Sequence, residues 1–143
     1  MSLVDAMLMI QDIVGNVAGV RSAPEYIPEK PGPGIFAVTL LSTGVFKQEP
    51  VQVLCGLHNF QLYVICPRME LPKTLKAILP LGELVAAELE NNETLRGFCS
   101  TFGEIPYTFE YNINLGTPAE PLWYAGWIFT ISGIKVEDSE ILT

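Results

Sequence analysis

The sequence predicts an α+β fold: a mainly antiparallel sheet of four to five strands, with two helices packed on one face. Two segments carry apolar residues at helical spacing, at about residues 2–17 and at residues 71–90. Segments rich in β-branched and aromatic residues lie between and after them. Because the strands do not alternate strictly with the helices, an antiparallel α+β sheet is favoured over a parallel βαβ fold.

The first helix is expected from Ser2 to about Val17. Ser2 is a good N-cap, and Asp5 three residues later resembles a capping box with Asp in place of Glu. Gly19 is a natural stop after the helix. Apolar residues recur at the spacing of one helix face, namely Leu3, Met7, Ile10, Val14 and Val17.

Residues 23–34 are rich in proline and separate this helix from the first strand. The segment holds four prolines and two glycines. It must be extended or turning, because proline and the residue before it both avoid helix. The roughly 20 residues before it are too few for a second domain. We therefore expect one domain over residues 1–143, with 23–34 as a surface connection.

The next strands are expected at Ile35–Leu41 and His58–Cys66, with a turn at Thr43-Gly44. The intervening Val45–Leu54 is ambiguous, because Pro50 interrupts it. The second strand alternates clearly, so one face should carry Phe60, Leu62, Val64 and Cys66.

The second helix is expected over Leu71–Glu90. Pro80 lies inside it, removes one backbone donor and clashes with the preceding turn. We therefore expect either a kink at this point or two abutting helices.

Two long runs then form an expected antiparallel pair, Phe98–Asn114 and Leu122–Val136. The first alternates apolar residues with polar ones, and the second is apolar on both faces. The acidic residues 137–143 are expected to fray. The apolar alternating set of the first run is Tyr107, Phe109, Tyr111 and Ile113.

The composition favours a protein that is covered by other subunits. Apolar residues make up 49% of the 143 residues, and charged residues 17%, against about 25% in ordinary globular chains. One core of this size leaves much apolar surface exposed. The net charge of −8 argues against binding nucleic-acid phosphates, and no apolar run approaches the ~18–20 residues that span a bilayer.

Motifs for catalysis or metal binding are weak. Cys55 and His58 have the spacing of half a zinc site, but Cys66 and Cys99 are isolated and supply no second half. The odd, wide cysteine spacing favours a reducing compartment. His58 lacks a motif that would supply a catalytic partner. We expect no catalytic residue, cofactor or metal.

Several local patterns accompany the order of the expected elements. The first helix ends in Gly19-Val20 and leads into the proline-rich stretch, and the second helix contains Leu79-Pro80-Leu81. That helix ends in the pattern Asn-x-Thr-Leu-x-Gly at residues 92–97. The last strand reads Trp-Tyr-Ala-Gly-Trp-x-Phe-Thr-Ile at residues 123–131. Together these patterns resemble those of the tail terminator and neck proteins of long-tailed bacteriophages.

The resemblance implies a small α+β subunit that forms a ring, usually a hexamer, at the head-proximal end of the tail. Such a ring stops polymerisation of the tail tube and contacts the tail tube protein and a head-completion protein. It implies no enzymatic activity and a location in the virion, after assembly in the host cytoplasm.

In such a ring, particular side chains are expected to make the subunit contacts or to line the lumen. Subunit contacts are expected at Tyr63, Tyr111, Trp123 and Trp127. The acidic balance suits a channel through which DNA slides without sticking, and it predicts that Glu104 and Glu110 line the lumen. The alternatives are another neck or head-completion protein, an accessory subunit of another oligomer, or a small enzyme or ligand-binding domain around Cys55, His58 and the tryptophans.

Overall fold

The computed structural model describes residues 3–20, 34–48, 54–68, 71–92 and 105–138. Two helices and four strands follow one another in the order helix, two strands, helix, two strands. Their bounds are α1 Leu3–Gly15, β1 Phe36–Gln48, β2 Leu54–Pro67, α2 Leu71–Asn91, β3 Tyr107–Asn114 and β4 Trp123–Asp138.

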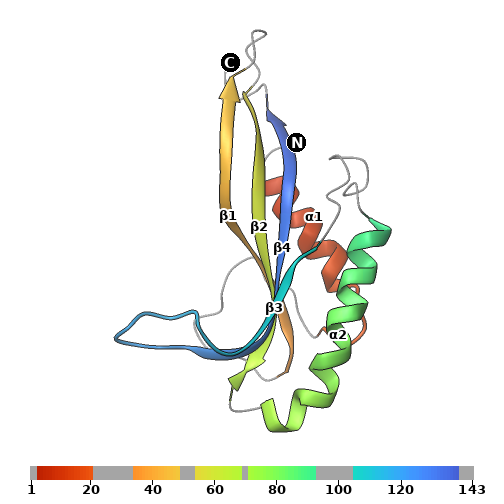
Figure 1. Cartoon of the computed structure of the whole chain (residues 1–143), viewed down its shortest axis with the longest axis vertical. Coiled ribbons are helices and arrows are strands. Elements are labelled where there is room, and N and C mark those ends of the chain that lie inside the picture. Colours follow the sequence, from red (N-terminus) through yellow and green to blue (C-terminus); the bar gives the residue numbers. More distant parts are fainter. Residues whose placement is uncertain (1–2, 21–33, 49–53, 69–70, 93–104, 139–143) are drawn as a thin grey trace.

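The four strands form one antiparallel sheet in the order β1-β2-β4-β3 (Figure 1). The two central strands, β2 and β4, are far apart in the sequence and are joined through α2 and β3. The two outer strands, β1 and β3, each have one edge that pairs with no described strand. The α+β class is therefore confirmed, with four strands.

Both helices pack on the same face of the sheet, as expected (Figure 1). The main core joins the predicted face of β2 to the apolar stripes of the helices. The Thr39 hydroxyl of β1 donates a hydrogen bond to the buried Gln11 side chain of α1, which fixes that helix to the sheet. The core includes Ala6, Ile10, Ile13, Val14, Phe60, Leu62, Val64, Cys66, Ile78, Leu81, Val85 and Leu89.

Helix α2 runs unbroken across Pro80, so the alternative of two abutting helices is wrong. Figure 1 shows that its axis changes direction in the N-terminal part. The indole of Trp127, on β4, packs closely over Gly82. A Cβ at Gly82 would lie 2.4 Å from ring atom Cζ2. The indole N–H also donates to the Ile78 carbonyl at 2.8 Å, so α2 and β4 meet at this point.

The turn expected at Thr43-Gly44 is wrong, because β1 continues through it to Gln48. The register against β2 shifts between Leu41 and Gly44, as at a β-bulge. A Cβ at Gly44 would lie 2.3 Å from His58 Nδ1. This glycine therefore lets a histidine pack across the strand pair, rather than starting a turn.

A second bulge overturns the alternation expected in β3. The register against β4 shifts between Glu110 and Ile113. Ile113 therefore leaves the face shared by Tyr107 and Phe109 and joins a smaller cluster on the helix-free face. That cluster centres on Phe36, Val38, Ile65, Ile113 and Tyr124.

The ends of the helices and of the last strand differ from expectation by a few residues. Strand β3 begins at Tyr107 rather than at Phe98, and residues 98–104 lie outside the described part. Helix α1 ends at Gly15 rather than at Val17, although Val17 still packs in the core. Glu137 and Asp138 belong to β4 and pair with β2, so fraying from residue 137 is wrong. Residues 139–143, the N-cap Ser2 and nearly all of the proline-rich segment 23–34 lie outside the described residues.

Candidate functional site

The distal part of the β1–β2 pair exposes large apolar side chains near the free edge of β1. Val45 and Leu57 lie directly opposite each other, and Val45 is 68% exposed. Phe46, the next residue, is also exposed and lies on the opposite face, where its ring contacts His58. We call the exposed group the β1 patch; its members are Leu41, Val45, Phe46 and Leu57.

The opposite edge of the sheet exposes aromatic side chains on β3. Tyr107 is 61% exposed and Tyr111 is 56% exposed. Tyr107 and Phe109 both make edge-on contacts with Trp127, with ring centroids 4.9 and 5.2 Å apart. Tyr111 in turn contacts Phe109 at 5.1 Å. These rings form a continuous β3 patch that reaches from the core to the free edge: Tyr107, Phe109 and Tyr111.

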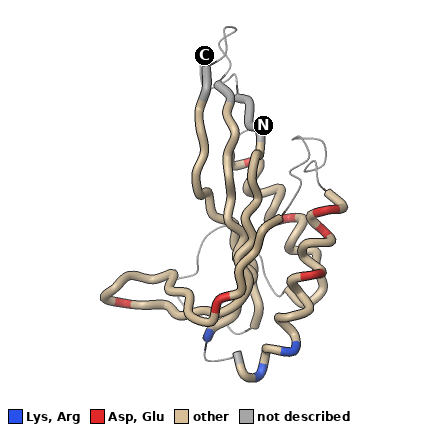
Figure 2. The backbone as a smooth tube through the Cα atoms, viewed as in Figure 1, with Lys and Arg blue, Asp and Glu red and all other residues tan. Residues whose placement is uncertain are grey.

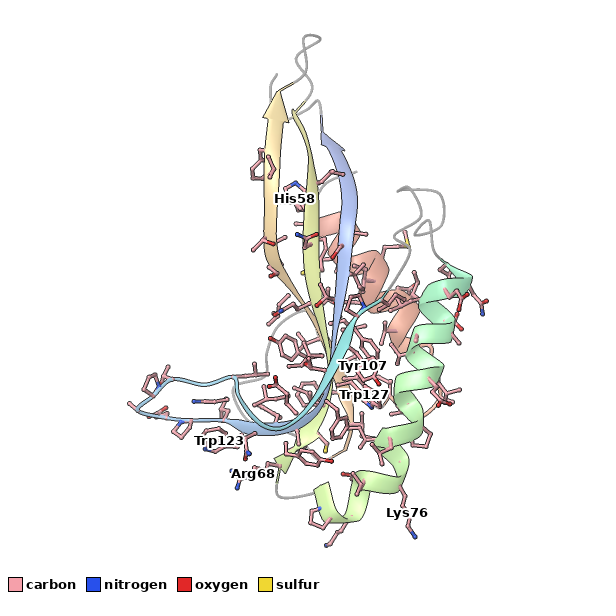
Figure 3. All side chains as sticks on the ribbon, in the orientation of Figure 1. His58, Arg68, Lys76, Tyr107, Trp123 and Trp127 are labelled. Carbon is pink, nitrogen blue, oxygen red and sulfur yellow. The ribbon has the colours of Figure 1, made fainter. Side chains whose placement is uncertain are left out.

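Trp127 has a largely intramolecular role. Its ring is half-buried, stacks on Phe129 at 5.8 Å and makes the hydrogen bond to α2 described above. Figure 3 shows Trp127 and Tyr107 close together between the sheet and α2. A subunit contact through Trp127 stays a prediction. Of the two contacting rings, Tyr107 and Trp127, Tyr107 is the more exposed.

Tyr63 lies on the helix-free face of the sheet, opposite Val38 and Ile128. Its side chain is half-buried, and its hydroxyl donates to Gln61 Oε1 at 3.1 Å. Burial raises the pKa of the Tyr63 phenol, and the nearby negative charge of Glu110 adds to the effect. The predicted contact residue and the predicted lumen carboxylate therefore share one face.

Trp123 begins β4 and is 44% exposed. The Arg68 guanidinium lies 5.9 Å from the centre of its ring, a cation–π arrangement (Figure 3). Figure 3 shows Trp123 far from His58, whose ring contacts Phe46 of the β1 patch. The residues predicted for subunit contact are therefore brought to two faces and one edge of the sheet, not to a single pocket.

His58 is the most unusual polar group among the described residues. It is 3% exposed, its ring lies 4.8 Å from that of Phe46, and its Nε2 has no hydrogen-bond partner there. Desolvation by burial lowers the pKa of this imidazole. The ring fits against Gly44 and Gly56, where a Cβ would come within 2.9 Å of it. This geometry makes His58 a packing residue of the strand pair.

The described cysteine and acidic side chains do not surround His58. Among the side chains that the structure describes, no three His, Cys, Asp or Glu residues gather closely enough to hold a metal ion. Cys66 is buried and lies 3.3 Å from the Thr74 hydroxyl. The Cys55 side chain, Cys99 and Glu104 are outside the described part. No helix among the described residues is long and apolar enough to cross a membrane.

The β1 patch is the feature that the sequence analysis missed. The signal was present in residues 45–57, which are apolar at both odd and even positions, but Pro50 made the segment ambiguous. Neither a scan against protein-family models nor a search of curated proteins finds a match to this chain.

Proposed function

We propose that this chain is a structural subunit of a long-tailed phage or prophage particle, acting as a tail terminator. Identical copies form a ring, usually of six, at the head-proximal end of the tail. The ring stops polymerisation of the tail tube protein and presents a surface to a head-completion protein. The proposal extends the sequence resemblance, and its alternative within the same particle is another neck protein.

One observation carries the proposal: the two free edges of the open sheet both expose large apolar side chains, and the two edges differ. The β1 patch offers Val45 and Phe46 on the edge strand, with Leu57 beside them on β2, whereas the β3 patch offers Tyr107 and Tyr111. Free edges of monomeric sheets are normally protected by charged residues or proline. Contact between two different surfaces of identical subunits is head-to-tail, and such contacts close into rings when the rotation fits.

The helix-free face of the sheet suits the channel side of such a ring. It carries Glu110 beside Tyr63, while both helices cover the other face. A carboxylate there repels the phosphates of DNA, so the nucleic acid passes without being held. A ring structure with a neutral or basic lumen would count against this part of the proposal.

Electron microscopy of particles made without this gene tests the function. A terminator's absence gives unjoined heads and over-long tails, because nothing stops the tube. Unjoined heads with tails of normal length would reject the terminator and favour the alternative neck protein. Tails of normal length that join heads normally would reject both.

A further inference from the structure

Helix α2 exposes several apolar side chains on its solvent-facing side. Leu79 is 44% exposed and Leu84 is 49% exposed. Ala77, Pro80 and Ala87 are also exposed. Four of these residues recur in steps of three and four, which places them on one stripe of the helix, away from its buried stripe. The stripe consists of Ala77, Pro80, Leu84 and Ala87.

Charged residues flank this stripe, and at each end of α2 their charge has the same sign as the helix dipole, which is unfavourable. Lys73 and Lys76 lie near the N-terminal end of α2, where the dipole is positive. Glu88 and Glu90 lie in the last turns, where the dipole is negative. Figure 2 shows the basic positions of α2 at one end and the acidic positions along the rest. No ion pair joins these four residues to any other residue that the structure describes.

We propose that the outer face of α2 is a contact surface for α2 of a second copy of this chain, packed antiparallel about a two-fold axis. The antiparallel arrangement places Ala77 of one helix opposite Ala87 of the other, and Pro80 opposite Leu84. It also brings Lys76 of each copy to the Glu88–Glu90 turn of the other. Both the apolar stripe and the charges are therefore self-complementary.

The charge pattern favours a second copy of this chain as the partner of α2. A contact of two copies about a two-fold axis uses the same patch twice, so the basic end and the acidic end are both neutralised. A head-to-tail contact between helix ends would join the charges but leave Leu84 exposed at the centre. The small side chains of Ala77 and Ala87 let the two helix backbones approach closely beside the larger Leu84.

The arrangement also identifies a residue that opposes the dimer. The two copies of Glu83 approach each other near the axis, because the pairs Ala77–Ala87 and Pro80–Leu84 both have their midpoint at residue 82, next to Glu83. Like charges at that position weaken association. Replacing this carboxylate with an uncharged amide of similar shape should therefore strengthen the dimer, whereas a solvent-facing glutamate far from any contact would have no effect.

This surface is separate from the sheet edges on which the proposed function rests. The dimer is a state of the free subunit and requires no ring. The two proposals can fail independently, because substitutions on α2 leave the β1 and β3 patches unchanged. The background variant Val45→Lys, at the β1 patch, keeps ring formation from contributing to the measurement.

Sedimentation velocity and light scattering over a concentration series test the inference on the full chain in this background. The starting protein should form dimers. Lys76→Glu and Glu90→Lys should each weaken dimerisation about tenfold, since each substitution alters two symmetric contacts. Leu84→Gln should weaken it as well, and Glu83→Gln should strengthen it. Glu120→Lys, in the β3–β4 connection, changes the net charge as Glu90→Lys does and should leave dimerisation unchanged.

Mixing the two charge-reversed proteins gives the sharpest result. Equimolar Lys76→Glu and Glu90→Lys chains should form a heterodimer as stable as the starting dimer, because every acidic turn again meets a basic one. Circular dichroism spectra would show that each variant is folded before mixing. A monomer at every concentration, dimerisation insensitive to Lys76 and Glu90, or a mixture forming rings or chains larger than dimers would overturn the proposal.

Discussion

At the scale of single residues, buried polar and small groups fix the geometry of the sheet. His58 fills the space left by Gly44, and Trp127 fills the space left by Gly82. The sequence marks both aromatic groups, but it does not show which glycine each one meets. Which glycine each ring contacts depends on the strand register and on the position of α2, and the periodicity of apolar residues predicts neither.

Acid should destabilise the protein through His58. Burial lowers the pKa of His58 in the folded chain below its value of about 6.5 in the unfolded chain. The folded state therefore binds this proton less readily, and its contribution to stability is full above the unfolded pKa. It is lost as the pH falls through the unfolded pKa towards the lower folded one.

Urea unfolding of the wild type and His58→Gln between pH 8 and pH 5 measures this effect. The wild type should lose more free energy of unfolding than the variant does over that range. The other acid-sensitive groups are common to both proteins and cancel in the comparison. Equal losses in the two proteins would show that His58 is as easily protonated in the folded chain as in the unfolded one.

Gly82→Ala should destabilise the fold, although alanine is the better helix former. The added Cβ would lie 2.4 Å from the Trp127 ring, and overpacking of this kind costs about 1–3 kcal/mol. Thermal and urea unfolding measure the loss. Trp127→Phe provides a background with a smaller ring, in which the cost of Gly82→Ala should shrink. A stabilising Gly82→Ala in the wild type would mean that Trp127 does not pack on this glycine.

At the scale of elements, the helices were predictable and the strand irregularities were not. The stripes of α1 and α2 follow directly from apolar spacing, and their bounds differ from expectation by a few residues. The bulges in β1 and β3 change which face a residue occupies without changing the residue pattern. Ile113 was therefore placed on the wrong face, and Thr43-Gly44 was mistaken for a turn.

The charges at the two ends of α2, which have the same sign as the helix dipole there, should lower the stability of the isolated subunit. Lys73→Glu places a negative charge near the positive end of the helix dipole and should raise the free energy of unfolding by about 0.5–1 kcal/mol at low salt. The measurement is urea unfolding at a protein concentration too low for dimers. Glu83→Gln, in the middle of the helix, is the control, with little dipole effect. A gain that persists at high salt would contradict a dipole origin.

At the scale of the whole molecule, much of the apolar area that the core does not bury lies on three exposed surfaces. Those surfaces are the β1 patch, the β3 patch and the outer face of α2. The composition predicted that apolar area would remain outside one core. It did not indicate where, because the location depends on the sheet order β1-β2-β4-β3, which leaves β1 and β3 at the edges.

A charge in the β1 patch should prevent ring assembly and leave the subunit folded. Val45→Lys places a lysine on an exposed position, so its cost to the monomer is small. The proposed contact would bury that charge and should fail. When the gene is deleted from the phage genome and the variant is supplied in its place, the variant should not restore head–tail joining. Val4→Lys, at a similarly exposed position of α1, should restore it; failure of both variants would remove the case for the β1 patch.

The proposed ring would lie at the head-proximal end of the tail, where its subunits can be imaged directly. Electron cryomicroscopy of particles from the genome that encodes this chain would resolve the proteins at that position. We expect a ring of this chain in which the β3 edge of each copy contacts the β1 edge of the next, with Glu110 facing the channel. Absence of the chain from the tail, or a ring joined through other surfaces with both edges exposed, would contradict it.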